Sequence, residues 1–251
     1  MAKTRSLMAK YLIIGNSAGG IGAVEAIRDV DREGQVAILS DEPYACYSRP
    51  LISKYLSKER TLETMLFRQA DFYSRNNVTS MLGKKVESLS PSDHAAELEN
   101  GECISWEKLL IATGGVPIVP KMEGANKKGV FTFTTLDDAK AIDEFIENVH
   151  SAVVIGGGLI GISVTEALKK RSVKVTVVEM KDRVLNTILD DKASSIAEEA
   201  LKKAGGTTTP EYYNAWLQLG QLTTAKATAN GDYRFVPASV PTKPISPKPV
   251  R

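Results

Sequence analysis

Two glycine-rich segments of similar design dominate this chain of 251 residues, LIIGNSAGGIG at 12–22 and VVIGGGLIGIS at 153–163. Each begins with a short apolar run and continues into a stretch whose apolar residues recur at helical spacing. A second apolar run completes each repeat, QVAILS at 35–40 and VKVTVVE at 173–179. Each repeat therefore predicts a βαβ unit, and such units wind right-handed into a parallel sheet.

The second segment fits the pattern G-x-G-x-x-G, with Gly156, Gly158 and Gly161 at the three positions. A helix N-terminus has unpaired N–H groups and partial positive charge, so a turn without side chains allows a pyrophosphate to approach it. Glu179 ends the next strand, where a carboxylate can bind both ribose hydroxyls. The predicted dinucleotide-binding residues here are Gly156, Gly158, Leu159, Ile160, Gly161 and Glu179.

The first segment is a variant of the same pattern, because Ser17 takes the middle position between Gly15 and Gly20. Ser40 ends its second strand, so the ribose acid is displaced to Asp41 or Glu42. A glycine pattern of this kind also occurs in tight strand-to-helix turns that bind no ligand. The strand, helix and acid around each copy favour nucleotide binding. The predicted residues here are Gly15, Ser17, Ala18, Gly20, Asp41 and Glu42.

The acid at the end of the second unit also indicates which nicotinamide nucleotide binds. A carboxylate repels a 2′-phosphate, so Glu179 favours NADH over NADPH. Lys181 and Arg183 follow closely and weaken this preference, although both also fit a solvated loop.

The rest of the chain is arranged around these units. Residues 69–76 predict a helix, 83–105 a small β-meander with turn signals, and 108–113 a buried strand. Residues 135–149 predict a helix capped by Thr135. Another helix is expected over 190–206, with Gly205 as its C-terminal cap.

After Gly206 the sequence loses clear periodicity, and VPASVPTKPISPKPVR at the end is rich in proline. This composition predicts a disordered, polyproline-like tail.

Charge and cysteine content exclude several classes of protein. A formal net charge of +2 gives no reason to expect nucleic acid or an anionic membrane as partner. The N-terminal segment MAKTRSLMAKYLIIG lacks the features of a signal peptide, and no apolar run is long enough to span a bilayer. Two cysteines, Cys46 and Cys103, form no CxxC pair, which is typical of a protein of the reducing cytoplasm.

Taken with the linking LLIATGG at 109–115, the two units resemble the FAD- and NAD(P)-dependent pyridine nucleotide-disulfide oxidoreductase superfamily. The segment SDEPYACYSRPLISKYL at 40–56 is similar to the branch of NADH oxidases, rubredoxin and ferredoxin reductases and the flavin part of nitrite reductase. The resemblance covers about residues 8–205. It implies an α/β fold with two Rossmann-like units, FAD in the first and NAD in the second, in three layers with a β-meander.

The resemblance also implies roles for residues outside the glycine turns. Arg49 and Lys54 match positions along the flavin, where a cation stabilises negative charge on the reduced ring, so Lys54 is the catalytic candidate. Val86 resembles the residue whose backbone meets adenine. The segment that passes close to FAD corresponds to Ala112, Thr113 and Gly114.

These matches divide the chain into four parts. We expect the FAD-binding domain over 8–118, a linker and helix over 119–150, and the first half of the NAD-binding domain over 151–206. Residues 207–251 look foreign to the family, which continues well beyond this length, so we expect a shortened or fused chain.

The departures from the family pattern also bear on function. The chain has no CxxxxC pair, and the redox cysteine of the oxidases aligns near Pro50 rather than Cys46, so we interpret Cys46 as a small, partly buried residue. The helix glutamate of the nicotinamide side is replaced by Ser163, and Glu166 one turn later is expected to face solvent. Gly231 and Asp232 only superficially match the family motif A-x-G-D.

Three functions fit these observations. The first is an NADH-dependent flavoprotein that passes electrons to oxygen or to a small redox protein. The second is a non-catalytic remnant that binds nucleotide weakly, and the third is a redox subunit completed by a partner. The sequence carries no motif for the electron acceptor or the oligomeric state.

Overall fold

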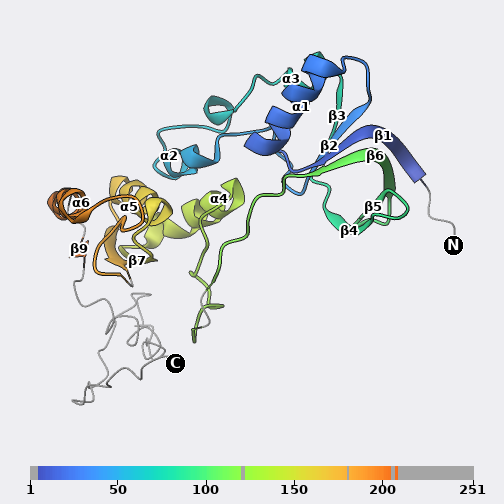
Figure 1. Cartoon of the computed structure of the whole chain (residues 1–251). Helices are drawn as coiled ribbons and strands as arrows, with labels where there is room; N and C mark the ends of the chain where they lie inside the picture. Colours follow the sequence, from blue (N-terminus) through green and yellow to red (C-terminus); the bar gives the residue numbers. More distant parts are fainter. Residues whose placement is uncertain (1–4, 120–121, 180, 205–206, 209–251) are drawn as a thin grey trace, which may run out of the picture. The chain divides into compact units, whose positions relative to one another are not determined.

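The computed structural model describes residues 5–119, 122–179, 181–204 and 207–208 of the chain. The chain divides into two compact units between Pro117 and Ile118 (Figure 1). Both are α/β units built around a parallel strand–turn–helix–strand repeat, as the sequence predicts. In the part that the structure describes, no helix has the length and apolar character needed to cross a membrane.

The first unit contains a six-stranded sheet in the order β3-β2-β1-β6-β5-β4. Strands β3, β2, β1 and β6 run parallel. Strand β5 pairs antiparallel with the start of β6 on one side and with β4 on the other. From β1 the chain adds β2 and β3 on one side and later returns to add β6 on the other side of β1. In open α/β sheets, ligands bind at such a switch in strand order, which here lies between β1 and β6. The strands are β1 (Arg5–Ile14), β2 (Val36–Ser40), β3 (Val78–Leu82), β4 (Val86–Ser90), β5 (Ala95–Leu98) and β6 (Cys103–Ile111).

Alternation along β1 and β2 places apolar side chains on both faces of this sheet. On one face Ile13 packs with Ile21 and Val24 of helix α1 (Ala18–Val30). On the other face Leu12 packs with Leu98 and other residues of the β4–β5 meander. Strands β4 and β5 belong to the edge of the same sheet but cover this second face, so helix, parallel strands and meander form the three layers that the resemblance implies (Figure 1). The short helices of this unit are α2 (Ile52–Leu56) and α3 (Phe72–Arg75), with 3₁₀ turns at Arg49–Leu51 and Glu63–Met65.

The second unit has a parallel sheet in the order β7-β8-β9 among the described residues. Helix α5 connects β7 to β8 and contacts both strands, and α6 lies between β8 and β9 in the chain. Helix α4 precedes β7 and starts at the predicted cap, Thr135. The elements are α4 (Leu136–Phe145), a 3₁₀ turn at Ile146–Asn148, β7 (Ser151–Ile155), α5 (Leu159–Lys170), β8 (Lys174–Val178), α6 (Asp191–Lys203) and β9 (Thr207–Thr208).

The prediction of a buried strand over 108–113 is wrong about burial, because none of these residues is buried. The strand exists as part of β6, but Leu110 is 41% and Ile111 is 59% exposed. The reason lies in pairing, because β5 pairs with β6 only at Cys103–Ser105. The last part of β6 has β1 on one side and, among the described residues, no strand on the other.

Smaller differences concern element boundaries. The helix expected over 69–76 is only one turn, and strands β3 and β9 were not predicted. The polar exposed residues Thr79 and Ser80 explain why β3 lacks an apolar pattern. The predicted cap Gly205, the tail beyond 208 and the motif at Gly231 lie outside the described residues.

Candidate functional site

The two glycine turns have the same backbone geometry. The amide of Gly15 donates to the carbonyl of Leu39 at 2.8 Å, and that of Gly156 donates to Val178 at 2.7 Å. Both glycines have positive φ, +119° and +103°, in the region that side chains disfavour. The two turns are therefore structural repeats at the carboxyl ends of β1 and β7.

The third glycine of each turn permits close packing of helix and strand. A Cβ added at Gly20 would lie 1.9 Å from the carbonyl oxygen of Gly15, and one at Gly161 would lie 1.8 Å from that of Gly156. Any side chain would push the helix away from the turn. This contact brings the first N–H groups of α1 and α5 to the turn.

The middle position is open space in the second turn. A Cβ added at Gly158 would meet no atom within 4 Å, so the absence of a side chain there serves no packing purpose within the protein. Ser17 stands at this position in the first turn, with φ of −119°, which any residue adopts. The serine therefore fits without strain.

The helices that follow the turns start without caps, unlike α4 and α6. Ser17 and Gly158 make no side-chain cap bond, and the first turns of α1 and α5 contain no acid. In contrast, Thr135 forms a capping box with Asp138 at α4, and Asp190 caps α6 through the amide of Ala193. The starts of α1 and α5 therefore keep their positive potential for an anion.

The chain around the first turn brings several predicted residues together. The amide of Ala112 donates to Ile14 at 2.7 Å, and a Cβ at Gly15 would lie 2.1 Å from the carbonyl oxygen of Ala112. The amide of Lys84 donates to Ser40 at 2.7 Å, which draws the start of β4, and with it Val86, toward the end of β2. Thr113 and Gly114 continue directly from Ala112.

The equivalent hydrogen bonds of the two turns also show which residues correspond at the ends of β2 and β8, where the acids for ribose are predicted. Because Leu39 and Val178 accept equivalent bonds, Ser40 is the counterpart of Glu179. The Glu179 carboxylate accepts from the amide of Gly157 at 2.6 Å and from that of Lys181 at 2.9 Å. A carboxylate has further lone pairs, so Glu179 keeps capacity for ribose hydroxyls.

In the first unit the acids follow this position. Asp41 is exposed, whereas Glu42 is 9% exposed and accepts hydrogen bonds from Tyr47 and Arg49. Arg49 also lies over the Tyr47 ring, 5.7 Å from its centroid. Glu42 thus anchors the segment that leads to Arg49, and Asp41 has the carboxylate open to solvent.

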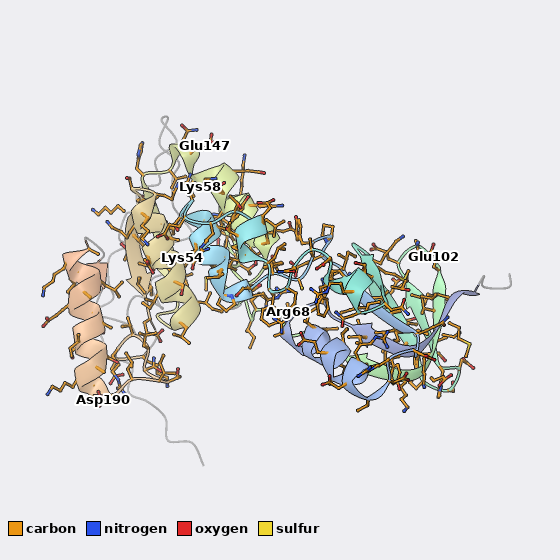
Figure 2. The ribbon with its side chains drawn as sticks, turned by 90° about the horizontal axis from the view of Figure 1, so that it is seen from above. Lys54, Lys58, Arg68, Glu102, Glu147 and Asp190 are labelled. Carbon is orange, nitrogen blue, oxygen red and sulfur yellow. The ribbon has the colours of Figure 1, made fainter. Side chains whose placement is uncertain are left out.

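Lys54 lies on α2, and Lys58 follows shortly after its end (Figure 2). The Lys54 ammonium is 3.4 Å from the carboxylate of Glu59. Arg68, on the segment that follows, forms an ion pair with Glu25 of α1. The structure therefore links Arg49 to the predicted acid Glu42, whereas the role of Lys54 beside a flavin stays a prediction.

Sequence reasoning missed a second group of residues beside the first turn. Asn16 hydrogen-bonds Tyr73 of α3 and the carbonyl of Tyr44, and the amide of Cys46 donates to the Tyr73 hydroxyl. Cys46 is 2% exposed, more buried than predicted. The polar Asn16 at a position where the second turn has glycine was the available signal.

Glu166 lies in solvent, as the sequence predicts. It pairs with Lys170 one turn later at 2.7 Å. Cys103 is buried at the start of β6, and both cysteines are free thiols.

Both turns thus fit a dinucleotide. Each combines an uncapped helix N-terminus with close-packed glycines, and an acid stands at or just after the end of the next strand. An α/β chain with two such units is a protein of the double dinucleotide-binding class. Residues 9–209 match the family described as "Pyridine nucleotide-disulphide oxidoreductase", and the chain belongs to this family.

Curated relatives agree with this assignment. The epsilon subunit of the NADH-dependent phenylglyoxylate dehydrogenase of Aromatoleum evansii is 34% identical over 197 residues, which is 78% of this chain and 47% of the relative. The ferredoxin–NAD(+) reductase component of the biphenyl dioxygenase system of Paraburkholderia xenovorans (strain LB400) is 29% identical over 238 residues, 94% of this chain and 58% of the relative. The chain therefore spans about half the length of these relatives.

Solved structures share the fold. Putidaredoxin reductase, in its covalent complex with putidaredoxin, is similar with a TM-score of 0.72 and 28% identity, over 80% of this chain and 49% of that chain. An NAD-dependent persulfide reductase from A. fulgidus gives a TM-score of 0.73 and 27% identity, over 79% of this chain and 39% of that chain.

Proposed function

We propose that this chain is the FAD- and NADH-binding part of a flavoprotein oxidoreductase that takes a hydride from NADH and passes electrons to oxygen or to a small redox protein. The observation that carries the proposal is the repeated turn, with close-packed glycines and an uncapped helix N-terminus in both units. The relatives support it, because their names include an NADH-dependent dehydrogenase subunit and a ferredoxin–NAD(+) reductase.

We assign FAD to the first unit and NADH to the second. FAD would supply a two-electron acceptor and NADH the hydride. In the first unit, the turn from Gly15 to Gly20 would hold the FAD pyrophosphate, with Asp41 at the adenosine ribose and Ala112 beside the cofactor. The exposed carboxylate makes Asp41 the better candidate, because Glu42 already accepts two bonds.

In the second unit, the turn from Gly156 to Gly161 would hold the NADH pyrophosphate. Glu179 would accept bonds from the adenosine ribose of NADH, and its negative charge would repel the 2′-phosphate of NADPH. The cations Arg49 and Lys54 would stabilise negative charge on the reduced flavin. Positioning and charge carry this chemistry, so no acid–base pair is required.

The proposal also covers the partners of the chain and its location in the cell. NADH is one partner, and a small redox protein is the candidate acceptor, as the covalent complex of the related reductase with putidaredoxin illustrates for that protein. We place the chain in the cytoplasm, where buried free thiols such as Cys46 and Cys103 stay reduced.

One observation favours a second candidate, a non-catalytic remnant that binds nucleotide weakly. Leu110 and Ile111 are exposed at the carboxyl end of β6, beside the first turn. Because these two apolar side chains are not buried, they contribute little stability to the end of β6 beside the turn. A less stable turn would bind FAD more weakly.

Anaerobic titration of the purified chain tests the proposal. The chain, incubated with FAD and desalted, should stay yellow, and NADH should bleach the flavin absorbance in the absence of oxygen. Admission of oxygen, or of oxidised ferredoxin or rubredoxin, should restore the colour and so identify the acceptor. A colourless protein after incubation with FAD would instead establish the remnant.

A further inference from the structure

A set of hydrogen bonds ties the first glycine turn to two elements outside its βαβ unit. The Tyr73 hydroxyl of α3 donates to Asn16 Oδ1 at 2.7 Å, and Asn16 Nδ2 donates to the carbonyl of Tyr44 at 3.1 Å. The amide of Cys46 donates back to the Tyr73 hydroxyl at 3.0 Å. We call this group, Asn16, Tyr44, Cys46 and Tyr73, the turn clamp.

The second turn is braced in a different way. Its counterpart of Asn16 is Gly157, whose amide donates to the Glu179 carboxylate at 2.6 Å. In the first unit the counterpart of that acid is Ser40, whose hydroxyl accepts instead from the amide of Glu42 at 3.1 Å. In the first unit, the Asn16 side chain and Tyr73 of α3 thus take the place that the Glu179 carboxylate has in the second turn.

The clamp fixes the loop that carries the predicted FAD contacts. Tyr44 and Cys46 lie between Glu42 and Arg49, which are themselves hydrogen-bonded to each other. The clamp therefore holds the turn and this loop in one arrangement. Burial raises the pKa of the Tyr73 phenol to about 12, and its protonated hydroxyl donates to Asn16.

We propose that Asn16 and Tyr73 are positioning residues for FAD, which hold the loop at 42–49 against the pyrophosphate turn before the cofactor binds. This inference rests on the assignment of FAD to the first unit. Apparent affinity falls in proportion to the fraction of protein in the binding-competent arrangement, so loss of the clamp weakens binding without altering the bound state.

The test compares Tyr73→Phe with Tyr11→Phe in the full chain. Tyr73→Phe keeps the ring and removes the hydroxyl that makes two bonds of the clamp. Tyr11→Phe is the matched control, because its hydroxyl bonds Asp31 at 3.0 Å in the loop before β2, away from the glycine turn. Apoprotein is titrated with FAD, and the urea midpoint is measured for each apoprotein.

We expect Tyr73→Phe to raise the FAD dissociation constant by about tenfold, and Tyr11→Phe to leave it unchanged. The spectrum of bound flavin and the kcat at saturating FAD should match the wild type. Exchange of the Cys46 amide with deuterium should become faster in the Tyr73→Phe apoprotein, because that amide loses its acceptor. Equal FAD affinity in Tyr73→Phe and wild type overturns the inference.

Asn16→Gly provides a second variant, because it copies the residue of the second turn. If the clamp acts as one unit, Asn16→Gly combined with Tyr73→Phe loses little more affinity than the worse single variant. Additive losses contradict the clamp. A wild-type chain that binds no FAD refutes the proposed function itself, whereas normal FAD binding in both variants refutes only the positioning role.

Discussion

A substitution at Gly158 can separate an effect on nucleotide binding from an effect on folding. Its φ of −77° and ψ of −174° suit any residue, and an added Cβ would meet no protein atom within 4 Å. We expect Gly158→Ala to fold normally with nearly unchanged stability. The reduced entropy of the unfolded chain contributes about 0.4–1 kcal/mol, and this gain is offset because alanine is a poorer N-cap residue than glycine. If the proposed site is correct, the methyl group would nevertheless occupy the space of the NADH pyrophosphate.

The expected loss of affinity follows from that overlap. Overpacking by one methyl group costs about 1–3 kcal/mol, which corresponds to roughly five- to 150-fold in the NADH dissociation constant. FAD binding should not change, because the first unit has its own turn. The measurements are NADH titration, flavin retention after desalting, and calorimetric Tm.

Gly161→Ala is the contrasting variant. Its Cβ would lie 1.8 Å from the carbonyl oxygen of Gly156, which is backbone, so α5 must shift at a cost of about 1–3 kcal/mol of stability. Unchanged NADH affinity in Gly158→Ala would refute the pyrophosphate site at this turn. Loss of flavin from Gly158→Ala would mean that the two cofactors are assigned to the wrong units.

Three further variants test other parts of the structure. Gly22→Ala, at an exposed position in α1 with open space around its Cβ, should stabilise the chain by about 0.5–1 kcal/mol in calorimetry without affecting either nucleotide. Asp190→Ala removes the side-chain cap of α6 and should cost about 1 kcal/mol, measured by urea unfolding. Hydrogen bonds from Lys10, the Gly34 amide and Tyr11 hold the pKa of Asp31 well below its ordinary value. The ionised carboxylate therefore stabilises the folded state at pH values above the pKa of Asp31 in the unfolded chain. This contribution is lost as the pH falls through the pKa of Asp31 in the folded state. Urea midpoints across the acid range should therefore fall less steeply in Asp31→Asn, and identical slopes would contradict this assignment.

The sequence predicted the two βαβ units because their signals are local. Glycine is required at Gly15 and Gly156 by their positive φ, and at Gly20 and Gly161 by the close approach of the backbone. The glycines in the sequence therefore indicate the backbone geometry of each turn. The cap at Thr135 was equally local, since a capping box needs only residues three apart. Such features involve neighbours in the chain and can be read without knowledge of the fold.

The contacts that sequence reasoning missed join distant segments. Tyr73 reaches Asn16 across a large separation in sequence, and α3 is too short to show a periodic pattern. Glu42 looked equivalent to Asp41 as a ribose acid, yet only the fold shows that Tyr47 and Arg49 already bond it. The burial of Leu110 was predicted from apolarity alone, whereas exposure depends on which strand pairs with β6.

Capping divides the four described helices of ten or more residues into two pairs. Helix N-termini leave N–H groups that need acceptors, and α4 and α6 obtain them from Thr135 and Asp190. The helices α1 and α5 follow the glycine turns and have neither a side-chain cap nor an acid in the first turn. An added aspartate at Ser17 or Gly158 would supply such a cap, worth about 0.5–2 kcal/mol to the helix. The same carboxylate would repel a pyrophosphate. The absence of an acid at both turns therefore favours anion binding through charge, just as the open space at Gly158 favours it through shape.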